Sequence, residues 1–154
     1  MSRAAKPKIS TQGPSIKGLA PEDDALVEAA RAAIRKRYQP GRHHIGAAVR
    51  TAAGKVYTAV HLDTYVGRAS VCAEAIALGR ALHDDNTPVV AVASVRHPRP
   101  TEPNQAIGIV APCGICREML ADFAPGCRVV VPDEKGAHTR TIEALLPNKY
   151  RRPG

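Results

Sequence analysis

Apolar side chains recur every three or four positions in three stretches of the chain, which is the spacing of an amphipathic helix. The first stretch opens at the acidic run after Pro21, where negative side chains favour the positive end of a helix dipole, and it ends before Pro40. The other two stretches run from Cys72 to His83 and from Cys113 to Phe123. The pattern therefore predicts three helices. Their apolar positions are Leu26, Ala29, Ala30, Ala33 and Ile34 in the first, Ala75, Ile76, Gly79 and Leu82 in the second, and Met119, Leu120 and Phe123 in the third.

Short runs rich in Val, Ala and Thr lie between these helices and are typical of strands. Residues 46–51 and 55–62 flank Ala53-Gly54 and predict a hairpin. Residues 88–95 and 128–131 are apolar runs typical of strands buried on both faces, and 107–111 is a short extended segment. Residues 63–71 and 96–105 are expected to be loops, the second because it contains three prolines. Strands that alternate with helices predict an α/β fold in which helices cover both faces of a sheet.

The composition indicates one globular domain. The chain has 154 residues, of which 44% are hydrophobic and 23% charged, so it is long and apolar enough to bury a core. Residues 1–20 are rich in Ser, Lys, Pro and Gly, and we expect them to form a flexible basic leader ahead of a single domain at 21–154. Since no apolar stretch suits a membrane span or a secretory signal, we expect a cytoplasmic protein without a membrane partner.

The net charge of +8 lies mostly at the two ends of the chain. Residues 1–20 carry +4 and residues 149–154 carry +3, which leaves +1 for residues 21–148. An enzyme that acts on nucleic acid is expected to have a basic face on its folded body, because phosphate contacts dominate its affinity. Nucleic acid is therefore not expected as a partner, and the ends are interpreted as solvated tails.

Two cysteines at the start of the third predicted helix have the spacing of metal ligands. Cys113 and Cys116 are three positions apart and follow Pro112, so they share one face of the first helical turn. The helix N-terminus favours the thiolate form that metals need. A lone C-x-x-C motif leaves three interpretations open: half of a zinc site, a redox pair, or coincidence.

Cys72 and Glu74 make a catalytic zinc site the leading interpretation. Cys72 supplies a third thiolate from the start of another helix, and three protein ligands leave the fourth position of a tetrahedral zinc open for water. Such a zinc lowers the pKa of its water, and Glu74 is close enough in sequence to carry the proton to a substrate. Arg117 is expected either to fold back toward a thiolate or to be an ordinary surface charge. Cys127 begins a buried strand and is expected to be a small core residue.

A cysteine followed by Ala-Glu, together with P-C-x-x-C, is the signature of zinc nucleobase deaminases. The chain resembles the cytidine deaminase superfamily over roughly residues 25–150, in the branch of the free-nucleoside cytidine deaminases and blasticidin-S deaminases. The segments at 45–48, 54–58 and 145–147 add to this resemblance. It implies a three-layer α/β/α sandwich around a five-stranded mixed sheet, and a homotetramer.

The resemblance also implies roles for individual residues. Cys72, Cys113 and Cys116 would bind Zn²⁺. Glu74 would move protons from the zinc water to the ring nitrogen and then to the departing ammonia. The backbone N–H of Ala73 would contact the base.

The residues expected to contact the substrate depart from the pattern of cytidine deaminases. His61 and Asp63 stand where those enzymes usually have the Asn and Glu that hold ribose hydroxyls. His43, or His44 if the loop shifts, replaces a Phe that packs at the base. Ala75 and Ile107 stand where an Arg occurs in one or the other branch. Tyr150 corresponds to a Tyr near the active site of blasticidin-S deaminases. These departures predict a nucleoside or aminated base other than plain cytidine or blasticidin S. The predicted substrate contacts are Ala73, His43, His61, Asp63 and Tyr150.

Three other functions compete with a small-molecule deaminase. A polynucleotide-editing deaminase is disfavoured by the nearly neutral body and by Cys instead of His before Ala-Glu. A structural zinc module, or a relative that binds zinc and a ligand without catalysis, is disfavoured by the open fourth position and by Glu74. A dithiol redox protein that uses Cys113 and Cys116 would hold little metal.

Overall fold

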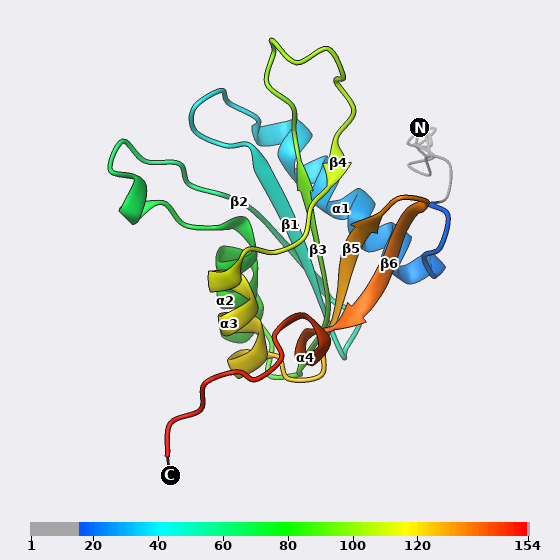
Figure 1. Ribbon diagram of the computed structural model, residues 1–154, viewed down its shortest axis with the longest axis vertical. Coiled ribbons are helices and arrows are strands. Elements are labelled where there is room, and N and C mark those ends of the chain that lie inside the picture. Colours follow the sequence, from blue (N-terminus) through cyan, green and yellow to red (C-terminus); the bar gives the residue numbers. More distant parts are fainter. Residues whose placement is uncertain (1–15, 154) are drawn as a thin grey trace, which may run out of the picture.

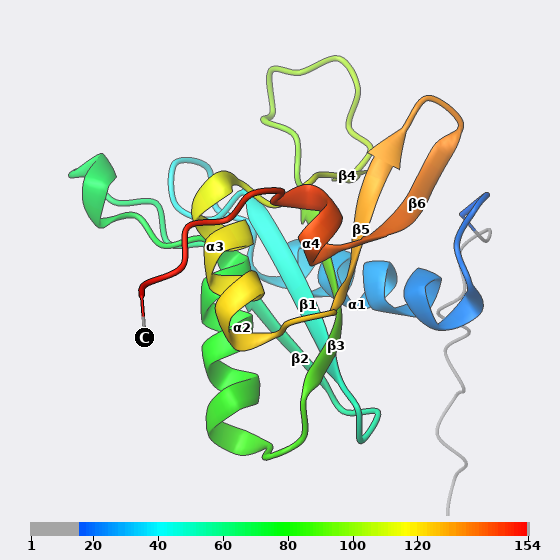
Figure 2. The ribbon, with the colours of Figure 1, turned by 60° about the horizontal axis from the view of Figure 1, so that its bottom comes forward.

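The computed structural model describes residues 16–153 and shows a mixed sheet between two layers of helices (Figure 1). One helix, α1, lies on one face of the sheet, and α2 and α3 lie side by side on the other, as the second view confirms (Figure 2). The elements are α1 (Pro21–Arg37), β1 (Ile45–Thr51), β2 (Val56–Val60), the 3-10 turn η1 (Gly67–Ala69), α2 (Ala73–Asp84), β3 (Val89–Arg96), β4 (Gly108–Ile109), α3 (Gly114–Phe123), β5 (Arg128–Asp133), β6 (Gly136–Thr141) and α4 (Ile142–Leu145).

In the described residues the sheet has six strands, five of which follow the order β2-β1-β3-β5-β6, while the short β4 pairs with β3. Only the β3–β5 pair is parallel among these neighbours. The predicted three-layer sandwich with a five-stranded mixed sheet is therefore confirmed for the main order, and β4 adds a sixth strand. The predicted helices and the β1–β2 hairpin are confirmed, with ends that differ by a few residues.

The face predicted for α2 is wrong: Ala77, Leu78 and Ala81 are buried, whereas Gly79 and Leu82 are exposed. In α3, Leu120 is buried as predicted, but Phe123 is exposed.

Strand β6 was not predicted, and its sequence explains why. Residues 136–141 read Gly-Ala-His-Thr-Arg-Thr, in which Ala137 is the only apolar side chain to mark a buried face. This strand lies at one edge of the sheet, where it pairs with β5 alone. An edge strand needs little apolar character, because much of its surface meets water.

Alternate residues along the strands supply the two cores. Ala48, Ala91 and Ala93 face α1, and Val49, Val92 and Val129 face α2 and α3. Small residues on the α1 side let this helix approach the sheet closely. The tightest point is Gly46, where an added Cβ would lie 2.6 Å from the carbonyl oxygen of Ala30.

The start of α1 is fastened to the sheet by a buried carboxylate. Asp23 is 2% exposed and pairs with Arg50 of β1 at 2.8 Å and with Arg128 of β5 at 3.2 Å. A carboxylate so buried needs such partners to offset the loss of water. The two ion pairs fix where α1 begins on the sheet.

The predicted leader at 1–20 falls mostly outside the described residues, which begin at residue 16. Ile16 and Leu19, near the end of that segment, are partly buried and pack against the core on the α1 side. The division into a leader and a single domain stays a prediction. No helix within residues 16–153 has both the length and the apolar character needed to cross a membrane.

Candidate active site

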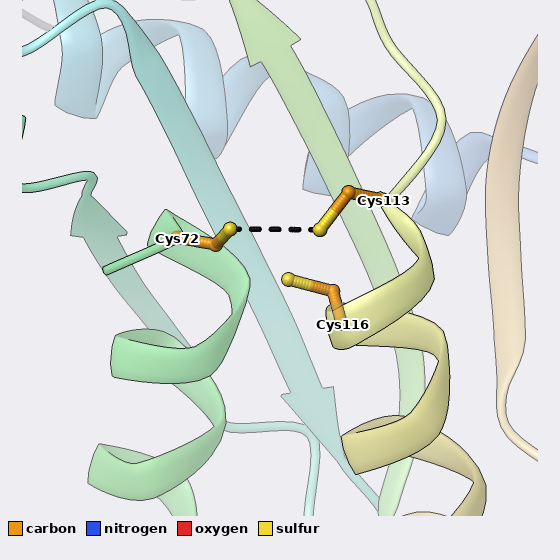
Figure 3. Close-up of side chains that lie close together, drawn as sticks. All are labelled: Cys72, Cys113 and Cys116. Carbon is orange, nitrogen blue, oxygen red and sulfur yellow. Dashed lines mark hydrogen bonds between the residues drawn. The ribbon is translucent and has the colours of Figure 1, made fainter. Parts of the chain in front are cut away.

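Three cysteines from two helix N-termini meet at one point of the molecule (Figure 3). Cys72 is the N-cap residue of α2, Cys113 is the N-cap residue of α3, and Cys116 lies on the first turn of α3. The Sγ atoms of Cys72 and Cys113 are 3.6 Å apart, and all three sulfurs lie within 4.8 Å of one another. The predicted third ligand is therefore next to the C-x-x-C pair, although 41 positions separate Cys72 from Cys113.

The surroundings of the three thiols oppose the loss of all three protons unless a cation is bound nearby. Burial raises the pKa of Cys116 far above its usual value, and the carboxylate of Glu74 raises it further. Burial also raises the pKa of Cys72, and its contact with Cys113 adds to this. Burial acts in the same direction on Cys113, but hydrogen bonds from the backbone N–H of Cys116, from the other two thiols and from the backbone N–H of Ile115 together outweigh it and lower the pKa of that thiol. A bound metal ion would supply the missing positive charge.

The sulfur geometry fits zinc. Thiolate sulfurs at ~2.3 Å from a tetrahedral zinc lie about 3.8 Å from each other. The observed separations, from 3.6 Å to at most 4.8 Å, match this spacing. Three sulfurs fill three of four tetrahedral positions, so such a metal keeps one position for water or a ligand.

A cavity of about 260 Å³ opens beside the cysteines. It has mostly apolar walls with few polar groups, which is typical of a site for a small molecule. The lining residues are Ile45, His61, Ser70, Val71, Cys72, Glu74, Val110, Ala111 and Cys113. Two of the predicted ligands and the predicted proton carrier thus face one small space.

Glu74 is held in this cavity by α2. It is the second residue of the helix, directly after Ala73, and it is 5% exposed. Its charge acts on the thiols of Cys116 and Cys72, whose pKa values it helps to raise. A buried carboxylate beside a metal site and a cavity has the placement that proton transfer requires.

Of the predicted substrate contacts, His61 is the one that is among the residues lining the cavity. Nδ1 of His43 lies 2.7 Å from the carbonyl oxygen of His61. Asp63 accepts a hydrogen bond of 3.4 Å from Ser70, which itself lines the cavity. His43 and Asp63 are not lining residues themselves, but each contacts one.

Other predicted residues are not among those that line the cavity. Ala73 is fully buried at the first position of α2, between the lining residues Cys72 and Glu74. Tyr150 is 74% exposed and is not part of the wall in a single chain. Arg117 does not turn to a thiolate: it donates to the carbonyl oxygens of Pro112 and Leu145, and so ties α3 to α4. The hydrogen bonds of Arg117 depend on how α3 and α4 pack, so they could not be predicted from the sequence pattern.

Several wall residues carry no chemical signal that a sequence pattern could reveal. Ile45, Val71, Val110 and Ala111 are small or apolar, and Ser70 looks like any loop serine. Their only hint is position: Ser70 and Val71 come just before Cys72, and Val110 and Ala111 come just before the C-x-x-C motif. Residues that flank such motifs are reasonable candidates for the walls of a cavity.

The comparison with protein families decides the affiliation of this chain. The family model "Cytidine and deoxycytidylate deaminase zinc-binding region" matches residues 20–131. The chain belongs to this family. As a member of a deaminase family whose matched region binds zinc, and with three sulfurs that suit this metal, it has zinc as its cofactor.

Known deaminases cover nearly the whole described chain. A blasticidin-S deaminase from Bacillus cereus is 43% identical over 131 residues, which are 85% of this chain and 94% of that protein. A cytidine deaminase from Sporosarcina psychrophila is 28% identical over 82% of this chain and 90% of its own. The crystal structure of cytidine deaminase from Burkholderia pseudomallei superposes with a TM-score of 0.66 at 30% identity, over 82% of this chain and 97% of that one. Deaminases of this kind are hydrolases that act on C–N bonds.

Proposed function

We propose that this protein is a zinc-dependent hydrolytic deaminase of a free cytidine-like nucleoside, or of a related aminated base. The observation that carries the proposal is the convergence of three thiols and one buried carboxylate on a single small cavity. The overall reaction adds water to the amino-bearing carbon of the base and releases ammonia, so the amino group becomes a carbonyl group.

In this proposal Cys72, Cys113 and Cys116 hold the metal. When bound, zinc supplies a water whose pKa is lowered toward neutrality. Glu74 accepts the proton that this water loses and donates it to the ring nitrogen next to the reacting carbon. The same carboxylate then carries a proton to the departing ammonia. The backbone N–H of Ala73, at the start of α2, orients the base.

The charges around the cavity favour a substrate without phosphate. No Lys or Arg is among the described residues that line it. Sites for phosphate normally supply such cations or several free backbone N–H groups. The net charge of +1 for residues 21–148 likewise gives little support for a polynucleotide substrate.

The predicted preference for a substrate other than cytidine or blasticidin S stays a prediction. It depends on His43, His61 and Asp63, which replace the family's usual residues. The relative with 43% identity is a blasticidin-S deaminase, so blasticidin S is the compound that tests this prediction most directly.

The experiment is a measurement of ammonia release by the zinc-loaded protein. The panel contains cytidine, deoxycytidine, cytosine, blasticidin S, adenosine and deoxycytidylate, each also offered to a Glu74→Gln variant. We expect turnover of at least one unphosphorylated compound by the natural chain and its loss in the variant. A zinc-loaded chain that releases no ammonia from any compound would point instead to a relative that only binds zinc and a ligand.

We also propose that the protein assembles as a homotetramer. The segment 62–71 projects from the body in both views (Figures 1 and 2). It carries exposed apolar side chains. Tyr65 is 94% exposed and Val66 is 67% exposed, which is costly for a chain that stays alone. A second copy of the chain is the proposed cover. Sedimentation velocity should give a mass near four chains, and a monomer would contradict the proposal.

The proposed compartment is the cytoplasm. A site of three thiols works only where cysteines stay reduced. Cell fractionation followed by detection of the protein tests this assignment.

A further inference from the structure

Arg117 holds both peptide groups that flank the metal ligand Cys113. Its side-chain Nε donates to the carbonyl oxygen of Pro112 at 2.9 Å, which belongs to the peptide before Cys113. Its backbone N–H donates to the carbonyl oxygen of Cys113 at 3.0 Å, which belongs to the peptide after it. The Cα of Cys113 therefore lies between two fixed peptide planes, and these planes set the direction of its side chain.

Cys113 lies where packing restrains the backbone little. Both Cys113 and the next residue, Gly114, are exposed. Beyond its chain neighbours and its own helix, nothing lies within 4 Å of the place where a Cβ of Gly114 would stand. Glycine has great backbone freedom, and Pro112 has no N–H to hydrogen-bond the turn. The two contacts of Arg117 thus supply a restraint that packing does not give to this ligand.

The guanidinium of Arg117 is anchored to α4, which lies beside α3 (Figure 2). Its Nη1 donates to the carbonyl oxygen of Leu145 at 3.1 Å, at the end of α4. This helix begins at Ile142, which is fully buried and whose N–H donates to the carbonyl oxygen of Cys127 at 3.0 Å. The N–H groups of a guanidinium lie in one rigid plane. Anchoring at Leu145 therefore fixes the place of Nε, and with it the Pro112 carbonyl, relative to the core.

Within residues 16–153 no carboxylate forms an ion pair with Arg117. The acidic side chains Glu118 and Asp122 of the same helix pair with Lys149 instead. Arg117 is half-buried and directs its side-chain donors to two carbonyl oxygens. These contacts suit the fixing of a turn and not a surface ion pair.

We propose that Arg117 is a positioning residue of the metal site. Through the two peptides that flank Cys113, it holds this thiol where the sulfurs of Cys72 and Cys116 can share a metal ion with it. Residues that orient metal ligands in this way typically cost about 10- to 100-fold in metal affinity when they are changed. The proposal concerns the binding of zinc and does not depend on the identity of the substrate.

Two variants of similar length test the contact with Pro112. Arg117→Gln keeps an amide N–H at the place of Nε, whereas Arg117→Met has no donor there. Both variants lose the hydrogen bond to Leu145, and both keep the backbone hydrogen bond to Cys113. They therefore differ from each other at the carbonyl oxygen of Pro112.

Lys149→Met is the matched control. Lys149 also ties the C-terminal segment to α3, through Glu118 and Asp122, but these contacts involve neither Pro112 nor Cys113. Zinc affinity of each protein is measured by competition with a chromophoric chelator. Cobalt-loaded samples give a second readout, because the sulfur-to-cobalt charge-transfer absorption reports how many thiolates bind the metal.

We expect Arg117→Met to bind zinc about 10- to 100-fold more weakly than the natural chain, with less charge-transfer absorption per cobalt. Arg117→Gln should bind zinc about three- to tenfold more tightly than Arg117→Met, because one hydrogen bond is kept. Without the anchor at Leu145 it should still bind at least about threefold more weakly than the natural chain. Lys149→Met should match the natural chain in both readouts.

Equal zinc affinities for Arg117→Gln and Arg117→Met would overturn the role of the contact with Pro112. If Arg117 only linked α3 to α4, its variants would have a lower Tm without metal but the zinc affinity and cobalt spectrum of the natural chain, which would overturn the whole proposal. If Arg117→Met does not fold, a natural zinc affinity in Arg117→Gln has the same meaning. A chain that shows the expected ranking but releases no ammonia from any compound would refute the proposed function and leave this role of Arg117 intact.

Discussion

Two residues at the start of α2, Cys72 and Glu74, are expected to have different functions in the site: one binds the metal and the other transfers protons. Cys72, at the N-cap position, points its sulfur to the two sulfurs of α3, while Glu74 lines the cavity. A residue that only tuned the metal would be replaceable by a similar amide. A residue that carries protons would not be, because an amide cannot accept and release a proton at neutral pH.

The first prediction follows from this difference. Glu74→Gln should lower kcat by about 10²- to 10⁴-fold, which is the usual contribution of general acid–base catalysis. Zinc content, measured by atomic absorption, should stay at one ion per chain, because the three sulfurs are unchanged. A variant that keeps more than a tenth of the activity would show that another group carries the proton.

Two histidines next to the cavity give the fold a dependence on pH. Burial, and then the imidazole of His44, lowers the pKa of His61. Burial, and then Arg99, lowers the pKa of His44. The folded chain therefore binds fewer protons at these sites than the unfolded chain, whose histidines titrate near ~6.5. The neutral histidines therefore contribute fully to the free energy of unfolding above about pH 6.5. This contribution is lost as the pH falls toward the lowered pKa values of the folded chain.

The second prediction is that acidification from pH 7 to pH 5 lowers the Tm of the natural chain more than that of His44→Gln. Differential scanning calorimetry of metal-free protein measures this without the effect of zinc release. His83→Gln serves as the control, since His83 is exposed on α2 and should leave the slope of Tm against pH unchanged. Equal slopes for all three proteins would contradict the assignment to His44.

At the scale of elements, the position of the site depends on how closely helices pack on the sheet. Helix α1 approaches β1 so closely that a Cβ added at Gly46 would lie 2.6 Å from the carbonyl oxygen of Ala30 and 2.9 Å from the Cβ of Ile34. Strand β1 continues from Ile45, which lines the cavity and whose N–H holds His61. If β1 shifted away from α1, Ile45 would therefore move as well and the wall of the cavity would change.

The third prediction tests this packing. Gly46→Ala should destabilise the protein by about 1–3 kcal/mol, because backbone atoms must move to make room for a methyl group. Gly79→Ala is the matched control: nothing lies within 4 Å of a Cβ there, and Ala in a helix is more stable than Gly by about 0.5–1 kcal/mol. Urea unfolding compares the two. A Gly46→Ala protein as stable as the natural chain would show that α1 can shift freely.

Elements with a strong pattern of apolar residues could be predicted from the sequence. Helices α2 and α3 have regular apolar spacing, and β3 and β5 are continuous apolar runs. Strand β6 has a polar edge pattern and was missed. In the site, the proximity of Cys113 and Cys116 could be predicted because their spacing places them on one helix turn. The expectation that Cys72 and Glu74 join them came from the combination of the two motifs, not from spacing. The anchoring of His61 by 43–45 and the inward packing of Ile16 could not be predicted, because both are contacts between distant parts of the chain.

At the scale of the whole molecule, the metal site joins two helices that are covered by one sheet. Cys72 belongs to α2, and Cys113 and Cys116 belong to α3, while β3 and β4 separate them along the chain. The two apolar cores of the described residues lie on both faces of the sheet, and neither contains Cys72, Cys113 or Cys116. Zinc is therefore expected to strengthen the fold without being required for it.

The fourth prediction concerns removal of the metal. At free zinc a thousandfold above Kd, loss of zinc should lower the free energy of unfolding by about 4 kcal/mol. Far-ultraviolet circular dichroism should change little, since the helices keep their packing on the sheet. Thermal unfolding with and without a chelator measures both effects. Collapse of the spectrum on chelation would show instead that the metal is needed for folding.

The distribution of the sulfurs along the chain also sets an order of events during folding. Cys113 and Cys116 are neighbours, so they can hold a metal as soon as the first turn of α3 exists. Cys72 lies 41 positions before Cys113, and it reaches them only after β3 has brought α2 alongside. The number of sulfurs that can bind one metal ion therefore increases as the chain folds. The two sulfurs of α3 require only a local helical turn, whereas the sulfur of Cys72 requires the assembled sheet. With cobalt in place of zinc, the colour of the metal would report how far folding has advanced.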